Sequence, residues 1–334
     1  MKQLNSQPPS HLPVPAQNHS APLHFVINAA AGQHEQAATR QAINAALQVQ
    51  GRCGELLFTD PKELAHVAKQ AAATALAQHS AVIAVGGDGT INTVAQAAHA
   101  LGCAMGVLPQ GTFNYFARTH GIATDTTQAL QTLLRCDPLP VQVGLINSHV
   151  FLVNTSLGLY PELLQDREAL KTRFGRSRWV ALGAACLTLL GQHRQLHLQI
   201  ERGTSSRNVT TPTLFVGNNR LQLEQVGLAQ ACSLDLGYLA AIMLKPIGSL
   251  TMLGLLLRGS MGNLGEANAV ESFEFHRLQV MPRLPWGRHQ IRVAYDGEVS
   301  HMHVPLVFQV SPQPLYLIKP ATALGATGHA GGHP

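Results

Sequence analysis

One turn in this chain places an acidic residue among glycines, directly after a short apolar segment. Residues 81–92 read AVIAVGGDGTIN, and a helical pattern of apolar residues follows them. Glycine allows a backbone to approach a ligand closely, and the unpaired N–H groups at a helix start favour an anion. A carboxylate beside phosphates is repelled unless a divalent cation lies between them, so Asp88 indicates a Mg²⁺-nucleotide. The same pattern is also typical of a plain strand-to-helix turn with an Asx residue.

A second glycine turn lies in residues 106–118, which read GVLPQGTFNYFAR. It again joins an apolar segment to a polar one through a Pro/Gly turn. Neither turn has the P-loop pattern, and Asn92 stands where a dinucleotide-binding motif needs its last glycine. The two common classes of nucleotide-binding protein are therefore disfavoured.

Taken together, the two turns resemble the catalytic region of the diacylglycerol kinase-like lipid kinases, which include sphingosine, ceramide and bacterial lipid kinases. The resemblance extends over most of the chain. Residues 28–32 (NAAAG) are similar to the family's N-P-x-x-G nucleotide loop, with Ala29 in place of proline. Thr59 matches a threonine that contacts nucleotide in relatives. Residues 293–298 (VAYDGE) resemble the segment that carries the family's catalytic glutamate, here Glu298.

The resemblance implies a kinase site between two domains. Glu298 is the expected general base, which accepts the proton of a lipid hydroxyl as the γ-phosphoryl group leaves ATP. Asp296 is expected to lie on the same strand face as Glu298, so that the pKa of one of these two carboxyl groups is raised. Either acid could equally be a solvated residue at the end of a strand. Asp88 is expected to hold the Mg²⁺ of Mg-ATP. The residues expected to bind the nucleotide are Asn28, Thr59, Gly86, Gly87, Gly89, Thr90, Asn92, Gly111, Thr112 and Asn114.

Two positions depart from the family pattern. Tyr115 stands where relatives often carry aspartate, and Leu236 stands where bacterial relatives carry an aspartate of an accessory Mg²⁺ site. Leucine offers no ligand oxygen, so Asp235 is the remaining candidate metal ligand there. Asp235 would point to the opposite face if the segment is extended. These departures leave open a different lipid acceptor, or weak or absent catalysis.

The elements that would position these residues fall into two groups. Apolar and helical segments alternate in the first, at 25–27, 37–49, 56–58, 63–78, 82–85 and 91–101. This order predicts an α/β domain with a mostly parallel sheet and helices on both faces. Candidate strands then follow at 151–154, 196–201, 213–217, 239–244, 273–280, 291–295 and 303–310, with helices at 162–172, 177–190 and 249–262. A C-terminal antiparallel β-sandwich is therefore expected, as the resemblance also implies.

The predicted organisation has four parts. They are a disordered tail at 1–21, a nucleotide-binding catalytic domain at 22–140, a β-sandwich domain for the lipid substrate at 141–312, and a C-terminal segment with a mobile tail at 313–334. The first twenty residues do not resemble a signal peptide. No apolar run reaches the roughly 18 residues that span a bilayer.

Charge and composition favour an anionic partner. The net charge is +5, and basic residues gather between Arg167 and Arg178, next to Trp179. Such a segment is typical of contact with lipid headgroups, or of a solvated helix face. The basic residues are not interleaved with stacking aromatics, which disfavours nucleic acid. Five scattered cysteines without a C-x-x-C motif indicate reduced thiols in a cytoplasm, and the 17 histidines show no convincing ligand spacing.

The expected function is ATP-dependent phosphorylation of a diacylglycerol-like lipid by a cytoplasmic enzyme in transient contact with the inner leaflet. Two alternatives remain: a kinase of a soluble acceptor such as NAD or a polyol, and a nucleotide- or lipid-binding protein without catalysis. Tyr115 and Leu236 motivate the last of these. Retention of Glu298 and Asp88 argues against it, because a binding protein has no use for a proton acceptor.

Overall fold

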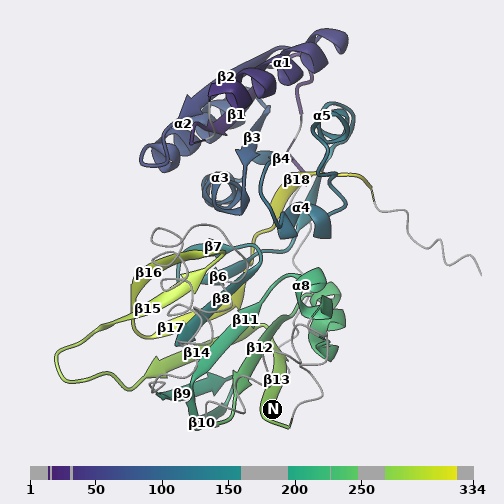
Figure 1. Cartoon of the computed structure of the whole chain (residues 1–334). Helices are drawn as coiled ribbons and strands as arrows, with labels where there is room; N and C mark the ends of the chain where they lie inside the picture. Colours follow the sequence, from purple (N-terminus) through teal and green to yellow (C-terminus); the bar gives the residue numbers. More distant parts are fainter. Residues whose placement is uncertain are drawn as a thin grey trace, which may run out of the picture.

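The computed structural model describes residues 14–15, 17–30, 33–158, 195–225, 227–246 and 268–321. Figure 1 shows an α/β domain stacked on a domain made of strands. The helices expected at 162–172, 177–190 and 249–262, and the basic segment that ends at Trp179, lie outside the described residues.

The N-terminal domain is built around a six-stranded sheet with the order β2-β1-β3-β4-β18-β5. The neighbours from β2 to β18 pair in parallel, and β18 pairs with β5 antiparallel. β3 and β4 are buried at every residue, as expected of central strands covered on both faces. The strands are β1 (Leu23–Asn28), β2 (Gly54–Thr59), β3 (Ala81–Gly86), β4 (Ala104–Pro109), β5 (Pro138–Val141) and β18 (Leu315–Ile318).

Two helix pairs pack on this sheet: α1 contacts α5, and α2 contacts α3. Their bounds are α1 (Gln33–Val49), α2 (Leu64–Ala77), α3 (Asp88–Leu101), α4 (Tyr115–Thr119) and α5 (Thr126–Arg135). α3 ends at Gly102, whose φ of 70° is the left-handed conformation that glycine adopts without strain. The expected α/β domain with a mostly parallel sheet is confirmed.

The second domain consists of two antiparallel sheets, with the orders β10-β9-β14-β17-β6-β7 and β13-β12-β11-β8-β15-β16. One apolar cluster fills the space between them, with Leu198 and Phe308 from the first sheet and Leu214 and Val293 from the second. This arrangement confirms the expected β-sandwich. The elements are β6 (Gly144–Ile146), β7 (His149–Phe151), β8 (Asn154–Gly158), β9 (Leu196–Arg202), β10 (Ser205–Thr211), β11 (Thr213–Gly217), α8 (Arg220–Gln225), the 3₁₀ helix η1 (Ala229–Leu236), β12 (Leu239–Leu244), β13 (Val270–Phe275), β14 (Arg277–Pro282), β15 (Gln290–Tyr295), β16 (Glu298–His303) and β17 (Leu306–Val310).

Three of the expected strands were wrong, because each is divided. Residues 273–280 form the end of β13 and most of β14, which belong to different sheets and meet at His276. The apolar positions move there from odd numbers (Phe273, Phe275) to even numbers (Leu278, Val280). A slip of one residue turns the side chains to the other face of a strand, so this slip marks the corner. Residues 303–310 are likewise divided between β16 and β17, and residues 151–154 between β7 and β8.

The chain crosses between the two domains in a two-stranded ribbon. Leu315 of β18 pairs with Val141 of β5 on one side of the boundary, and Val310 pairs with Gly144 on the other. Between them, the N–H of Ser311 donates to the carbonyl of Val143 at 2.9 Å. The C-terminal segment thus returns to the first domain and supplies one of its strands. No helix within the described ranges has both the length and the apolar character needed to cross a membrane.

We expect Gly106→Ala to lower the free energy of unfolding by about 1–3 kcal/mol, because β4 leaves no room for a larger residue. An added Cβ would lie 2.2 Å from Cδ2 of Leu133 on α5 and 2.7 Å from Cδ1 of Ile83 on β3. Urea denaturation measures the change. The control is Val49→Ala, whose side chain is 81% exposed and should change stability by less than about 0.5 kcal/mol. A Gly106→Ala variant as stable as the native chain would show that α5 does not pack closely against β4 at this position.

Candidate active site

Most of the predicted site residues lie where parallel strands end. Asn28 is the last residue of β1, Thr59 of β2 and Gly86 of β3, and the second glycine turn follows β4. In an open α/β sheet, ligands bind outside this carboxyl edge. Four separate segments of the sequence are therefore brought to one edge of the domain.

Hydrogen bonds connect these strand ends. The side-chain amide of Asn28 donates to the hydroxyl of Thr90 at 3.2 Å, while its Oδ1 accepts the N–H of Ala30 at 3.0 Å. The N–H of Ala29 donates to the carbonyl of Thr59 at 2.9 Å, and the buried Thr59 hydroxyl donates to the carbonyl of Asp60 at 3.3 Å. The loops after β1 and β2 are thus held together, and the loop after β1 is tied to the start of α3.

The two glycine turns touch each other. The N–H of Gln110 donates to the carbonyl of Gly86 at 2.8 Å, and a Cβ added at Gly111 would lie 3.0 Å from the Cα of Gly87. Asn114 closes the second turn: its Oδ1 accepts the N–H of Gly111 at 2.9 Å, and its Nδ2 donates to the carbonyl of Gly111 at 2.8 Å. Its φ of 49° is a left-handed conformation that asparagine tolerates. Thr112 is exposed on the same turn.

Asp88, the first residue of α3, has the properties of a ligand for a cation. Burial raises the pKa of its carboxyl group, and the backbone N–H groups of Asn114 and Tyr115 lower that pKa in part. Its Oδ1 is buried and has no hydrogen-bond partner among the described residues. No group of three or more His, Cys, Asp or Glu side chains in the described ranges could hold a metal. Mg²⁺ in nucleotide sites commonly takes one or two carboxylates and completes its shell with phosphates and water, so Asp88 fits this role.

Glu298 comes from the second domain and reaches the first glycine turn. It is the first residue of β16, and its side chain is exposed. A Cβ added at Gly89 would lie 3.3 Å from Oε1 of Glu298. The structure therefore places the carboxylate of Glu298 against the turn that also contains Asp88.

The expectation that Asp296 and Glu298 share a strand face was wrong. Asp296 and Gly297 are the two loop residues of a hairpin between β15 and β16, with φ angles of 45° and 91°. Positive φ at both positions is characteristic of a type I′ turn, for which Asp-Gly is a favoured pair. The Asp-Gly pair in the sequence could have indicated this hairpin. The side chain of Asp296 leaves the strand and enters the boundary between the domains.

The Asp296 carboxylate is buried and accepts four hydrogen bonds. The N–H groups of Leu152, Val153 and Asn154 donate at 2.6, 2.8 and 2.9 Å, and the side-chain amide of Asn92 donates at 2.7 Å. Burial raises the pKa of Asp296 to about 6, although all four donors act to lower it.

Asn92 therefore connects α3 to the second domain, since its amide also donates to the carbonyl of Val150 at 3.0 Å. Its predicted contact with the nucleotide stays a prediction. The role of Asn92 in this interdomain contact was not anticipated from the sequence.

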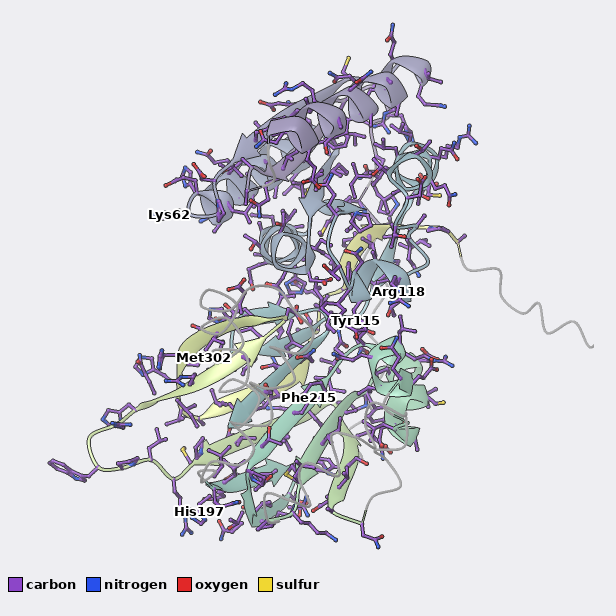
Figure 2. All side chains as sticks on the ribbon, in the orientation of Figure 1. Lys62, Tyr115, Arg118, His197, Phe215 and Met302 are labelled. Atoms are coloured by element: carbon purple, nitrogen blue, oxygen red, sulfur yellow. The ribbon has the colours of Figure 1, made fainter. Side chains whose placement is uncertain are left out.

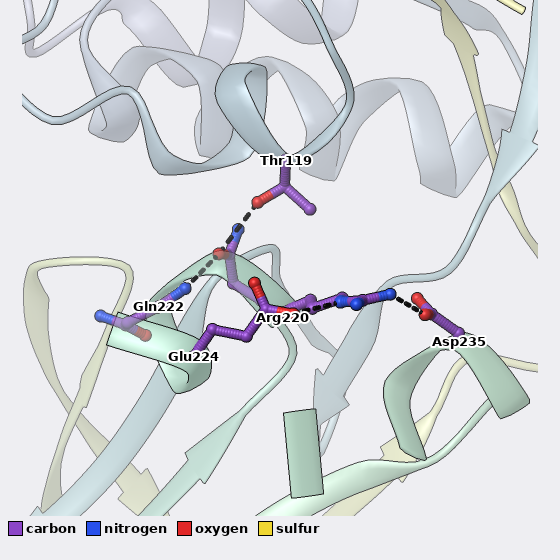
Figure 3. Close-up of polar contacts among 6 residues, drawn as sticks. Thr119, Arg220, Gln222, Glu224 and Asp235 are labelled. Carbon is purple, nitrogen blue, oxygen red and sulfur yellow. Dashed lines mark hydrogen bonds and ion pairs between the residues drawn. The ribbon is translucent and has the colours of Figure 1, made fainter. Parts of the chain in front are cut away.

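Tyr115, which stands where relatives often carry aspartate, forms a second contact between the domains. The hydroxyl of Tyr115 donates to Oε1 of Gln225 on α8 at 3.3 Å, and its ring stacks on Phe113 with 5.8 Å between centroids. Figure 2 shows Tyr115 at the junction of the two domains. On the same helix, the hydroxyl of Thr119 donates to Oδ1 of Asn219 at 3.0 Å (Figure 3).

The residues around Asp235 do not fit the accessory metal site. Asp235 lies in the 3₁₀ helix η1 rather than in an extended segment. Its carboxylate pairs with the guanidinium of Arg220, which also binds Glu224 (Figure 3). A cation would have to displace an arginine from this carboxylate. The neighbouring Leu236 is 74% exposed and supplies no ligand.

Comparison with known proteins shows the family of this chain. The diacylglycerol kinase catalytic domain matches residues 22–146. A Pseudomonas aeruginosa protein named "Probable lipid kinase YegS-like" is 30% identical over 305 residues, which cover 86% of this chain and 93% of that protein. This chain belongs to the diacylglycerol kinase-like lipid kinase family.

Two further members of the family are similar over different extents. The diacylglycerol kinase of Bacillus subtilis is 35% identical over 140 residues, which are 41% of this chain and 44% of that protein. The similarity thus spans less than half the length of the B. subtilis kinase. A crystal structure of a diacylglycerol kinase from Bacillus anthracis shares the fold, with a TM-score of 0.64 at 17% identity, and the match covers 90% of this chain and 97% of that one.

We expect the contribution of Asp296 to stability to depend on pH. Its pKa of about 6 in the folded protein lies above the roughly 3.9 of an unfolded chain, so the folded state binds the proton more tightly. Its contribution therefore falls as pH rises from about 4 to about 6 and stays at its lower level above that window. Asp296→Asn removes this titration. The native chain should lose free energy of unfolding relative to the variant across the window, measured by urea denaturation. A difference that does not vary with pH would rule out this linkage.

Proposed function

We propose that this chain uses ATP and Mg²⁺ to phosphorylate the hydroxyl group of a diacylglycerol-like lipid. Membership of the lipid kinase family supports the reaction type. The observation that carries the assignment of roles is the approach of Glu298, from the second domain, to Gly89 in the first glycine turn. A proton acceptor and an anion-binding turn in contact are the two parts that a phosphoryl transfer to an alcohol requires.

In this proposal, the nucleotide binds at the carboxyl edge of the parallel sheet. The two glycine turns present backbone N–H groups near the start of α3, where an anion is favoured. Asn28 and Thr90, which are hydrogen-bonded to each other, would contact the phosphates beside Gly86, Gly87 and Gly111. Thr59, Thr112 and Asn114 would border the rest of the nucleotide. Mg²⁺ held at the unpartnered oxygen of Asp88 would supply positive charge to the phosphates.

The lipid hydroxyl would lie between Glu298 and the terminal phosphate, and Glu298 would accept its proton as the phosphoryl group is transferred. The neighbouring Tyr295 does not compete for this proton. Burial raises the pKa of Tyr295, and the negative charges of Glu298 and Asp296 raise it further. Tyr295 therefore remains a neutral phenol. Because the substrate is a lipid, the enzyme would work in transient contact with a membrane surface.

Replacing Glu298 with glutamine should lower lipid phosphorylation at least about 100-fold, since an amide cannot accept the proton. The measurement is transfer of radioactive γ-phosphate from ATP into a total lipid extract presented in mixed micelles. Binding of Mg-ATP, measured by calorimetry, should be unchanged in this variant. The control Glu274→Gln alters an exposed acid on β13 and should retain full activity. A native chain that binds Mg-ATP but labels no lipid would favour a soluble acceptor or a catalytically silent protein.

Asp88→Ala should abolish Mg-ATP binding and leave the fold intact, because it removes the carboxylate assigned to the cation. Calorimetry reports the affinity, and circular dichroism reports the fold. The native chain titrated with ATP in the presence of a chelator should show the same loss. An Asp88→Ala variant with native affinity for Mg-ATP would remove Asp88 from the nucleotide site.

A further inference from the structure

The loop between β14 and β15, residues 283–289, exposes a tryptophan completely. The sequence of this Trp286 loop is RLPWGRH, and the side chain of Trp286 is 102% exposed. Figure 1 shows the loop as an arm that extends away from the sandwich. Most of the surface of a tryptophan side chain is normally buried in a folded protein. A fully exposed tryptophan therefore indicates an interaction site.

The Trp286 loop is held in its shape by backbone hydrogen bonds at its base and its tip. At the base, the N–H of Arg283 donates to the carbonyl of His197 at 2.8 Å, and the carbonyl of His289 accepts from Val304 at 3.0 Å. At the tip, the N–H of Arg288 donates to the carbonyl of Pro285 at 3.1 Å. Gly287, with a φ of 78°, occupies the third position of this turn, where positive φ is required. The turn therefore presents Trp286 outward.

The charged residues that neighbour Trp286 in the sequence are all basic. Residues 280–295 contain three arginines (Arg283, Arg288 and Arg292) and no aspartate or glutamate. Both arginines that flank the tip are exposed, as are His289 and the adjoining Met281 of β14. An indole ring next to arginines suits the boundary between lipid headgroups and acyl chains, because the ring is amphipathic and the guanidinium groups pair with phosphates.

The small size of the loop favours a membrane, rather than a protein, as its binding partner. A stable protein interface buries about 1,200–2,000 Å² in total and has a broad, well-packed core. A single turn with one large apolar side chain does not provide such a surface. Partial insertion of one tryptophan beside two arginines is sufficient for reversible contact with an anionic membrane.

We propose that the Trp286 loop docks this enzyme on membranes with anionic lipids, with Trp286 at headgroup level and Arg283 and Arg288 beside lipid phosphates. The inference deepens the proposed function, on which it rests, by naming the surface through which the enzyme reaches its substrate membrane.

The loop acts as a tether and not as part of the catalytic site. It joins β15 at Gln290, whereas the turn before Glu298 follows Tyr295 at the other end of the same strand. Six residues of strand separate these ends by roughly 20 Å. Changes in the loop should therefore affect vesicle binding and the apparent KM for lipid in vesicles. They should leave kcat with a short-chain, dispersed lipid unchanged.

The test is co-sedimentation of the full chain with vesicles of phosphatidylcholine and phosphatidylserine, without ATP. Trp286→Ala should weaken binding about tenfold, and the double variant Arg283→Ala/Arg288→Ala should weaken it roughly 30-fold at low salt. The native chain should also bind more weakly when salt is added, and more weakly to vesicles of phosphatidylcholine alone than to vesicles that contain phosphatidylserine. The matched controls are Val49→Ala and Arg135→Ala, which remove an exposed apolar and an exposed basic side chain from the first domain. Both should bind like the native chain.

The outcomes separate the two proposals because vesicle binding is measured without catalysis. Vesicle binding that depends on Trp286, in a chain that phosphorylates no lipid, upholds the docking surface and contradicts the proposed function. Lipid phosphorylation with equal vesicle affinity in all variants upholds the function and overturns the docking surface. A Trp286→Ala variant that keeps its vesicle affinity but changes oligomeric state in gel filtration would assign the loop to a contact between copies instead.

Discussion

The burial of one carboxylate between the two domains determines how the rest of the site is arranged. Asp296 is buried, and its carboxylate accepts four hydrogen bonds, three from consecutive backbone N–H groups and one from the amide of Asn92. Its raised pKa shows that desolvation still outweighs these donors. The arrangement therefore carries a cost in stability, as is common where a structure is set up for function. In exchange, it fixes the position of the hairpin that leads to Glu298.

Both glycine turns continue into helices that are attached to the second domain. α3 follows the first turn and holds Asp296 through Asn92. α4 follows the second turn; its Tyr115 contacts α8, and its Thr119 contacts Asn219, the residue before α8. A ligand that alters either turn therefore acts directly on a helix that contacts the sandwich. The spacing between Glu298 and the glycine turns depends on these two attachments rather than on the turns alone.

The sequence predicted those parts of the structure that neighbouring residues determine. The strands and helices from β1 to α3 followed from local apolar periodicity, and the glycine turns followed from residue type. The Asp296 contacts could not be predicted in this way, because its partners Asn92 and Leu152 lie 204 and 144 positions away. The same limit applies to β18, whose four buried residues read as a strand only when placed beside β4 and β5.

The return of the chain through β18 gives the two domains a double connection. Both connecting segments run side by side as a paired ribbon, joined at Ser311 and Val143. A single linker would allow one domain to swivel about a bond, whereas a ribbon bends in one direction and resists torsion. A hinge motion between the two domains would therefore have a single preferred axis, along which Glu298 would move toward and away from Gly89.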